Sequence, residues 1–401
     1  MALIVQKFGG SSVADKERVF RVAGIIADTW AAGNNVIVVL SAQGKTTDGL
    51  IAKAHEINEE PSKREMDMLL ACGEQMSVAL CAMALEKMGL PVVSLTGWQI
   101  GLHTDSNYGD ARIRKITGER IQRELDQRKI ILVAGFQGIN KYDDVTTLGR
   151  GGSDTTAVAI AAAMQADLCQ IFTDVDGVYT ADPRKVEGAK KLQEITYDEM
   201  LELASCGAKV LHNRSVEMAK RYGVDLEVLS SFEKKPGTKV KEVAKLEQTK
   251  ISGVAKDTSV ARIAIIGLQD EPGVAFRVFR TMAQQKINVD LILQSIGRDG
   301  TKDISFTVKR VDVKDSVRCL EEIQEKLGFS RIDVNDGIAK VSVVGAGVAS
   351  HGVAAQVFEA LYNERININM ISTSEVRISV LVNEKDADRA VQAVHNKFFG
   401  E

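Results

Sequence analysis

Residues 147–156 read Thr-Leu-Gly-Arg-Gly-Gly-Ser-Asp-Thr-Thr and lead into an apolar helical stretch over 157–166. Glycine allows positive φ and a close approach of the backbone to a ligand. The first turn of a helix adds free N–H groups and the positive end of the helix dipole, which together predict an anion site. Arg150 can bind a carboxylate or phosphate there in bidentate fashion, whereas Asp154 must orient a cation or a donor. Because plain loops also contain glycine-rich turns, the rest of the chain must decide between a ligand site and a simple connection.

Short apolar runs alternate with amphipathic patterns through the first 230 residues. Runs dense in valine, isoleucine and leucine suit strands that are buried on both faces of a mostly parallel sheet. Their alternation with helices predicts an α/β layered fold. The expected strands are 2–8, 36–41, 91–96, 130–136 and 167–173, and the expected helices are 15–29, 64–88, 118–128 and 155–166.

Four of the expected strands end in turns rich in glycine or hydroxyl residues. These turns are 7–12 (KFGGSS), 41–49, 135–138 and 173–177. In open α/β sheets, ligands bind beyond the carboxyl ends of the strands. Four such turns therefore predict a ligand site at one edge of the sheet.

The bulk composition excludes several classes of protein. The 401 residues carry a net charge of −3, which argues against a nucleic-acid surface built on bulk charge, and they suffice for two or three domains. The five cysteines show no CxxC spacing and the five histidines are scattered, so we expect reduced thiols and no zinc site. The N-terminus has no signal-peptide pattern, and the longest uncharged apolar helix, 157–166, is too short to span a bilayer, which favours a cytoplasmic protein.

A charged stretch over 233–250 separates the α/β pattern from an internal repeat. Residues 260–295 align with 338–374 with a one-residue gap near Pro272 and His351, and each copy reads strand, glycine turn, helix and an Ile-Asn strand start. Helical patterns follow at 313–327 and 385–398. We therefore expect a catalytic domain over 1–232, a linker over 233–250 and two α+β modules over 251–330 and 331–401. A matched pair of this kind favours a ligand sensor over a purely structural duplication.

Five motifs resemble those of aspartate kinases, which are members of the amino-acid kinase superfamily. They are KFGGSSV at 7–13, SAQGKTTDGL at 41–50, GEQ at 73–75, TTLGRGGSDTTA at 146–157 and TDVDGVYTADPR at 173–184. No Walker or protein-kinase signature is present. The tail resembles the paired ferredoxin-like ACT modules of the same family, so the resemblance covers nearly the whole chain. It implies ATP-dependent phosphorylation of the side-chain carboxylate of L-aspartate to 4-phospho-L-aspartate, which opens the routes to lysine, threonine, methionine and diaminopimelate.

The resemblance also implies roles for single residues. Lys7 would reach the transferring phosphoryl group, and Asp154 would orient that lysine. Glu74 would take the ammonium of aspartate, and Arg150 would bind its α-carboxylate. Without the resemblance, Lys7 could be a surface lysine at a strand end and Glu74 a solvated helix residue. The other substrate residues implied are Thr47, Gly151, Gly152 and Ser153.

The nucleotide site implied by the resemblance spans several turns. The run 174–177 lacks the spaced oxygen ligands and the terminal glutamate of a calcium loop, so we expect no protein-built metal site and Mg²⁺ that arrives with ATP. Many relatives have an acidic residue where Lys45 stands, and whether Lys45 alters aspartate affinity or faces solvent stays open. Besides Lys7, the nucleotide residues implied are Phe8, Gly9, Gly10, Ser41, Thr173, Asp174, Tyr179, Thr180, Ala181, Asp182, Pro183, Arg184 and Lys209.

ACT pairs in the family bind end-product amino acids between modules, which implies inhibition by lysine, threonine or both. Asp270 suits the ammonium of such an effector, and the amides of the following turn suit its carboxylate. We expect a homo-oligomer joined through these modules. A heterotetramer with a separately translated tail stays an alternative, weakened by the lack of a methionine between Met218 and Met282. The effector residues implied are Asp270, Glu271, Pro272, Gly273, Val274, Ala275, Asn288, Val289, Asp290, Gln294, Val353, Ala354, Asn367, Ile368, Ser374 and Glu375.

Two rival functions stay open at this point. The first keeps the superfamily and changes the substrate, as in glutamate 5-kinase or acetylglutamate kinase, but neither is expected to combine KFGGSS, a Gly-Glu motif and a paired tail. The second is an amino-acid sensor with an inactive kinase domain. Retention of Lys7, Glu74, Arg150 and Asp154 argues against that decay.

Overall fold

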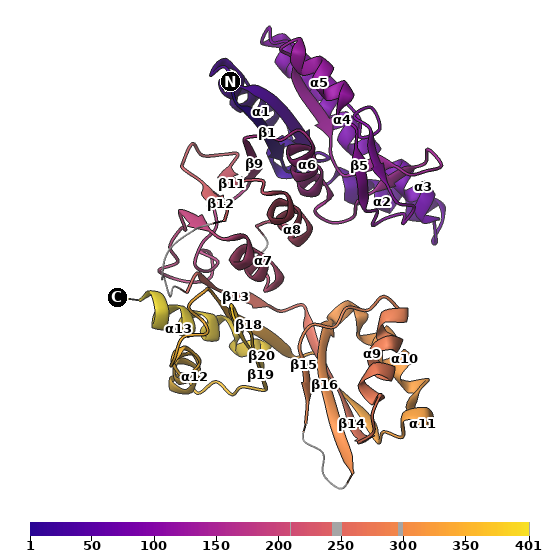
Figure 1. The fold of residues 1–401 in the computed structure, drawn as a ribbon, viewed down its shortest axis with the longest axis vertical. Coiled ribbons are helices and arrows are strands. Elements are labelled where there is room, and N and C mark those ends of the chain that lie inside the picture. Colours follow the sequence, from indigo (N-terminus) through magenta and orange to yellow (C-terminus); the bar gives the residue numbers. More distant parts are fainter. Residues whose placement is uncertain (209, 243–250, 296–299, 401) are drawn as a thin grey trace. The chain divides into compact units, whose positions relative to one another are not determined.

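A computed structural model describes residues 1–208, 210–242, 251–295 and 300–400. The chain divides into two compact units. The first comprises Met1–Tyr179, Lys191–Ser205 and Lys209–Leu246, and the second comprises Thr180–Lys190, Cys206–Ala208 and Glu247–Glu401. Figure 1 shows both units and labels many of their helices and strands.

An eight-stranded sheet, ordered β10-β12-β11-β9-β1-β2-β6-β3, is the centre of the first unit. Every neighbouring pair in it is parallel except β11 and β12. The mostly parallel α/β architecture expected from the apolar runs is therefore confirmed. The strands are β1 (Leu3–Phe8), β2 (Asn35–Leu40), β3 (Val92–Leu95), β6 (Ile130–Ala134), β9 (Leu168–Thr173), β10 (Glu194–Ile195), β11 (Leu226–Ser230) and β12 (Thr238–Val240).

Helices and a small second sheet complete this unit. Asp15 begins α1 by accepting a hydrogen bond from the Arg18 amide, and Ser62 begins α3 by accepting one from the Glu65 amide, as N-caps do. The helices are α1 (Lys16–Ala31), α2 (Thr46–Ile57), α3 (Lys63–Leu70), α4 (Cys72–Lys87), α5 (Glu119–Asp126), α6 (Gly152–Ala163), α7 (Tyr197–Ser205) and α8 (Asn213–Tyr222). The small sheet, ordered β5-β4-β7-β8, contains β4 (Leu102–Thr104), β5 (Ile113–Ile116), β7 (Gln137–Ile139) and β8 (Val145–Thr147).

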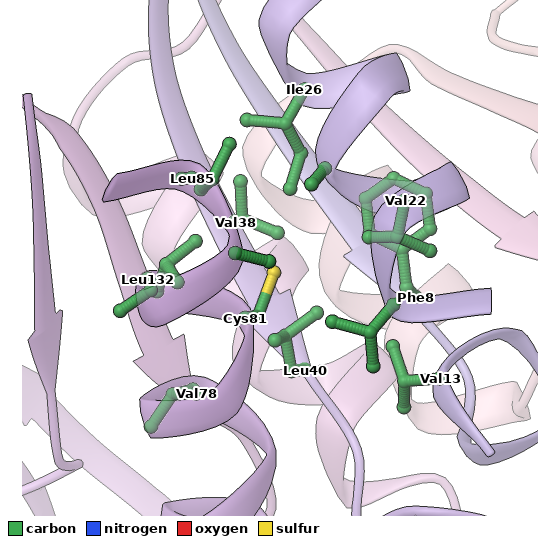
Figure 2. Close-up of a cluster of buried hydrophobic side chains, with 14 of the residues drawn as sticks. Phe8, Val13, Val22, Ile26, Val38, Leu40, Val78, Cys81, Leu85 and Leu132 are labelled. Atoms are coloured by element: carbon green, nitrogen blue, oxygen red, sulfur yellow. The ribbon is translucent and has the colours of Figure 1, made fainter. Parts of the chain in front are cut away.

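One face of the large sheet carries a cluster of buried apolar side chains (Figure 2). Val38 and Leu40 are two residues apart on β2 and so point to the same side, where they meet α1 and α4. The helix α6 packs against β1, β2 and β9. The side chains labelled in Figure 2 are Phe8, Val13, Val22, Ile26, Val38, Leu40, Val78, Cys81, Leu85 and Leu132.

The continuous helical stretch Lys63–Lys87, which joins α3 and α4, is long and apolar enough to cross a membrane by length and composition. Half of its most apolar window is buried inside the unit, and Cys81 and Leu85 are fully enclosed in the core. The stretch also buries the carboxylates of Asp67 and Glu74. These contacts are those of a core helix in a globular unit.

The second unit contains two antiparallel sheets of four strands each, ordered β15-β16-β14-β17 and β13-β18-β20-β19. Glycines with positive φ, Gly273 (92°) and Gly352 (87°), precede α9 and α12 at equivalent places, so the internal repeat has a structural counterpart. The elements are β13 (Gly253–Asp257), β14 (Val260–Gln269), α9 (Val274–Gln284), β15 (Ile292–Gln294), β16 (Thr301–Lys309), α10 (Val313–Glu321), α11 (Gln324–Leu327), β17 (Arg331–Asn335), β18 (Ile338–Val344), α12 (Val353–Asn363), β19 (Met370–Thr373), β20 (Arg377–Asn383) and α13 (Ala387–Phe399).

Strand pairing departs from the expected module limits in three places. The strand β17 pairs with β14, and β13 pairs with β18, so each sheet takes one strand from the neighbouring stretch of sequence. Within the expected linker, β12 alternates buried Thr238 and Val240 with exposed Lys239 and joins the large sheet, while residues 243–250 lie outside the described residues. The segment Thr180–Lys190 belongs to the second unit, where Thr180 Oγ1 lies 2.9 Å from His395 Nε2 of α13.

Candidate active site

The carboxyl ends of β9, β1, β2 and β6 meet at one edge of the large sheet, because these four strands are neighbours in that order and parallel. The four glycine- and hydroxyl-rich turns noted in the sequence follow these ends. Strand order, which the sequence does not state, thus brings together segments separated by more than a hundred residues.

Lys7 and Asp154 form an ion pair at this edge, with 2.6 Å between Lys7 Nζ and Asp154 Oδ1. Lys7 is the second-last residue of β1, and Asp154 lies in the first turn of α6. Their side chains are 12% and 13% exposed, so the pair is largely shielded while the ammonium keeps access to the edge. The structure thus brings together the two residues expected to act on the phosphoryl group.

The turn after β1 approaches the turn after β2 so closely that only glycine fits. A Cβ atom on Gly10 would lie 2.5 Å from the carbonyl oxygen of Ala42, and the Gly44 amide donates to Gly10 O at 3.0 Å. A Cβ on Gly9 would lie 3.5 Å from Lys7 Nζ. The missing side chains keep the approach to the lysine open.

Glu74 is 4% exposed and lies in the first turn of α4. Its Oε1 accepts a hydrogen bond from the Ala42 amide at 3.1 Å, while its buried Oε2 has no hydrogen-bond partner among the described residues. Burial raises the pKa of Glu74 to about 7, and the Ala42 hydrogen bond opposes part of that rise. An orphaned buried carboxylate oxygen of this kind calls for a cationic or hydrogen-bonding ligand.

The N-terminus of α6 has the geometry expected of an anion site. Gly151 precedes the helix with φ of 69°, and a Cβ on it would lie 2.2 Å from Cγ of His212. Gly152 and Ser153 then begin the helix, and both residues are buried. Arg150 projects from this turn as an exposed residue, and within the described residues its side chain has no ion-pair partner. A guanidinium so placed is available for a ligand carboxylate.

The turn after β2 carries Ser41, an expected nucleotide residue, and Thr47, the last of the expected substrate residues. Ser41 directly follows that strand, and Thr47 is the second residue of α2. Both are partly buried, whereas Lys45, at the N-cap position of α2, is exposed. The exposure of Lys45 favours solvent contact over a direct role in the site.

The expected nucleotide segment is divided between the two units. In the first unit, Thr173 Oγ1 donates to Asp174 Oδ1 at 3.0 Å, and the Tyr179 hydroxyl donates to Asp176 at 2.8 Å. In the second unit, Thr180 and Ala181 are buried, Pro183 is exposed, and Arg184 binds Asp182 through Nε and NH2 at 3.0 and 3.1 Å. Lys209 lies outside the described residues.

Two of the expected effector carboxylates are already paired inside the second unit. Asp270 Oδ1 lies 2.8 Å from Lys302 Nζ. Asp290 pairs with the buried Lys340 of β18 and lies 3.8 Å from Arg377. Val274 is buried in the core, whereas Asn288, Gln294, Asn367, Ser374 and Glu375 are exposed. An effector ammonium at Asp270 or Asp290 would therefore have to compete with a lysine.

Sequence reasoning missed two residues that fix the loops of this site. Asp67 is 1% exposed and accepts hydrogen bonds from the Thr147 amide (2.9 Å), the Thr147 hydroxyl (2.6 Å) and the Gly109 amide (2.9 Å). Burial raises the pKa of Asp67, against these hydrogen bonds. Arg214 binds the carbonyl groups of Leu148 and Ala111. Neither has a motif of its own, because both act across long separations in sequence.

Comparisons with known proteins place this geometry in a family. The amino acid kinase family profile matches residues 2–230, and an ACT domain profile matches 263–324 and 341–398. An aspartokinase from Mycolicibacterium smegmatis is 51% identical over 405 residues, which cover 99% of this chain and 96% of the relative.

Solved structures of E. coli aspartokinase III are similar over the whole chain. The complex with aspartate and ADP (R-state) has a TM-score of 0.86 at 28% identity and covers 99% of this chain and 100% of that one. The complex with lysine and aspartate (T-state) has a TM-score of 0.76 at 28% identity and covers 99% of each. These comparisons confirm the motif resemblance over the full length. They support neither the kinase of another substrate nor the inactive sensor. The chain belongs to the amino acid kinase family, and within that family it is an aspartate kinase that carries ACT domains.

Proposed function

We propose that this aspartate kinase transfers the γ-phosphoryl group of ATP to the side-chain carboxylate of L-aspartate and forms 4-phospho-L-aspartate. The observation that carries the proposal is the shielded Lys7–Asp154 ion pair at the same sheet edge as Glu74, whose buried Oε2 has no hydrogen-bond partner among the described residues. The product would be the first intermediate toward lysine, threonine, methionine and diaminopimelate. E. coli aspartokinase III, similar over the whole chain, has been solved with aspartate and ADP, which supports both substrates.

Aspartate presents one ammonium and two carboxylates, and the site offers a counterpart for each. Glu74 Oε2 would accept the ammonium, because it is buried and has no partner among the described residues. Arg150 would bind the α-carboxylate, assisted by Thr47 and by the amides of Gly151, Gly152 and Ser153 at the start of α6. The side-chain carboxylate would then be left free to react.

Lys7 would neutralise charge on the transferring phosphoryl group, with Asp154 holding its ammonium in place. An oxygen of the ionised side-chain carboxylate attacks the γ-phosphorus. The bond to the β,γ-bridging oxygen breaks, and ADP leaves with that electron pair. Because the nucleophile is already ionised, no proton has to move, and the protein contributes position and charge.

We propose that Lys7, Phe8, Gly9, Gly10 and Ser41 contact the nucleotide phosphates from the two turns that approach each other. The nucleotide base and ribose would use Thr173, Asp174, Tyr179 and the run 180–184, with Lys209. Mg²⁺ would arrive as the MgATP complex. Among the described residues no group of three or more His, Cys, Asp or Glu side chains could hold a metal, so phosphate oxygens and water would supply its ligands.

The ACT pair would confer feedback inhibition by lysine, threonine or both. Support comes from the matched modules and from E. coli aspartokinase III, which has been solved with lysine. The effector residues would be those of the turns 270–275 and 353–354, the segments 288–290 and 367–368, and Gln294, Ser374 and Glu375. Asp270 would exchange Lys302 for the effector ammonium. We propose a cytoplasmic homo-oligomer joined through these modules, and the heterotetramer remains the alternative assembly.

Acyl-phosphate formation, trapped with hydroxylamine, tests the proposal directly. The full chain is incubated with ATP, Mg²⁺ and L-aspartate, and then also with lysine, threonine or both. We expect hydroxamate that depends on ATP and aspartate and that decreases with at least one effector condition. Hydroxamate that no effector lowers would refute the regulatory part alone, and a folded sample without hydroxamate would refute the catalytic part.

A further inference from the structure

Arg214, in the first turn of α8, joins two loop segments of the site, one at Leu148 and one at Asp110 and Ala111. Its NH1 donates to Leu148 O at 2.5 Å and to Asp110 Oδ1 at 3.1 Å, and its NH2 donates to Ala111 O at 2.9 Å. The side chain is only 14% exposed. A planar guanidinium can satisfy two carbonyl groups at once, which a lysine ammonium on a flexible stem does less well.

The turn that begins at Leu148 is the one that carries Arg150. The Leu148 amide donates to Phe136 O at 2.8 Å, so the peptide groups on both sides of Leu148 are fixed, the second of them by Arg214. Gly149 follows with φ of 73°, and a Cβ on it would lie 3.0 Å from Asp110 Oδ1. The turn therefore packs against Asp110, which Arg214 also binds.

The far end of the same turn rests on the same segment of chain. Gly151 lies against His212, which is the N-cap residue of α8, two positions before Arg214. The helices α6 and α8 pack side by side (Figure 1). Residues 212–214 therefore support both ends of the turn, whose central residue, Arg150, is exposed.

We propose that Arg214 is a positioning residue for aspartate: it fixes the turn 148–151 so that the Arg150 guanidinium meets the α-carboxylate of the substrate. This inference rests on the proposed function, in which Arg150 binds that carboxylate. Arg214 itself does not touch the substrate. Its loss would let the turn move, and a displacement of about 1 Å at a positioning group can lower the rate by about 100-fold.

The test compares L-aspartate with L-isoasparagine, in which an amide replaces the α-carboxylate while the ammonium and side-chain carboxylate remain. Full-length wild type, Arg214→Lys, Arg214→Gln and Arg150→Ala are assayed for kcat/KM with both compounds and for the KM of ATP. We expect Arg214→Lys to lower kcat/KM for aspartate by about 10- to 100-fold, with less effect on isoasparagine and none on the KM of ATP. Arg221→Lys, an exposed arginine on the same helix, is the matched control and should behave as wild type.

The double variant Arg150→Ala/Arg214→Lys tests whether Arg214 acts through Arg150. If Arg214 acts through Arg150, the second substitution adds little to the first. If Arg150→Ala leaves the preference for aspartate over isoasparagine unchanged, the proposed function of Arg150 fails, and the inference with it. If Arg150→Ala removes the preference but the Arg214 variants keep it, the inference alone is overturned. Equal losses for aspartate, isoasparagine and ATP, or variants that do not fold, would make Arg214 a merely structural residue and also overturn it.

Discussion

Glu74→Gln tests whether the proposed ammonium site is a buried carboxylate whose Oε2 has no hydrogen-bond partner among the described residues. Burial raises the pKa of Glu74 from 4.5 to about 7. Because Glu74 holds its proton more tightly in the folded protein than in the unfolded chain, its protonation stabilises the fold. This contribution is complete below pH 4.5 and is lost as the pH rises through about 7. The difference of 2.5 units (7 − 4.5), at about 1.36 kcal/mol per unit, corresponds to about 3 kcal/mol, most of it lost between about pH 5 and pH 8. Glutamine cannot ionise, so the variant should not show this loss.

Urea unfolding followed by tryptophan fluorescence measures this difference, because Trp30 and Trp98 both lie in the first unit, as does Glu74. The free energy of unfolding is compared between wild type and variant at pH 5 and pH 8, without substrate. The comparison of the two pH values cancels any pH-independent effect of the amide. Between pH 5 and pH 8 the variant should gain about 2 to 3 kcal/mol relative to wild type.

Glu86→Gln, on the exposed side of the same helix α4, is the matched control and should follow the wild type at both pH values. In wild type, the KM for aspartate should increase as the pH falls below about 7, since a protonated Glu74 no longer attracts the ammonium. Equal pH dependence of unfolding in wild type and Glu74→Gln would refute the reasoning, because Glu74 would then not be a carboxylate made costly by burial.

Further predictions concern the phosphoryl site, the effector site and the C-terminal helix. Lys7→Ala should lower kcat by about 100-fold or more in a steady-state assay, as loss of one transition-state donor does, and an unchanged kcat would contradict its assignment. Asp270→Ala should abolish inhibition by the effector that acts on wild type, a coupling of about 5- to 150-fold in activity, and an equally sensitive variant would place the effector elsewhere. Burial, with a smaller effect of Lys190, lowers the pKa of His395, whose ring contacts Thr180 and Phe399, so the second unit should lose stability as the pH falls below about 6.5. Hydrogen exchange of the α13 amides should show this loss in wild type and not in His395→Phe, and equal acid sensitivity in both would contradict it.

Much of the kinase fold was predictable because its signal is local. Runs such as Val36–Leu40 have side chains that suit both faces of a buried parallel strand, and β2 has nearly the expected bounds. The helix α6 begins at Gly152, three residues before the expected 155, because Gly151 takes the left-handed conformation that precedes it. The glycines are evident in the sequence, but the sequence does not indicate at which of them the helix begins.

The parts that escaped prediction depend on contacts between distant residues. The exchange of β13 and β17 between the sheets follows from pairing with β18 and β14, and each of these strands is too short and too ordinary to reveal its partner. Asp67 and Arg214 are polar residues on helices, which usually face solvent. Only the fold shows that they bind loops 80 and 66 residues away.

The most direct test of the proposed reaction is to identify which carboxyl group of aspartate is phosphorylated. L-Aspartate labelled with ¹³C at the side-chain carboxyl carbon is incubated with the full chain, MgATP and hydroxylamine, and the hydroxamate carbon is identified by NMR. We expect that the labelled carbon becomes the hydroxamate carbon, and that Lys7→Ala nearly abolishes this product. A hydroxamate at the unlabelled α-carboxyl carbon would contradict the placement of that group on Arg150, and a folded enzyme that forms no hydroxamate would contradict the proposed reaction.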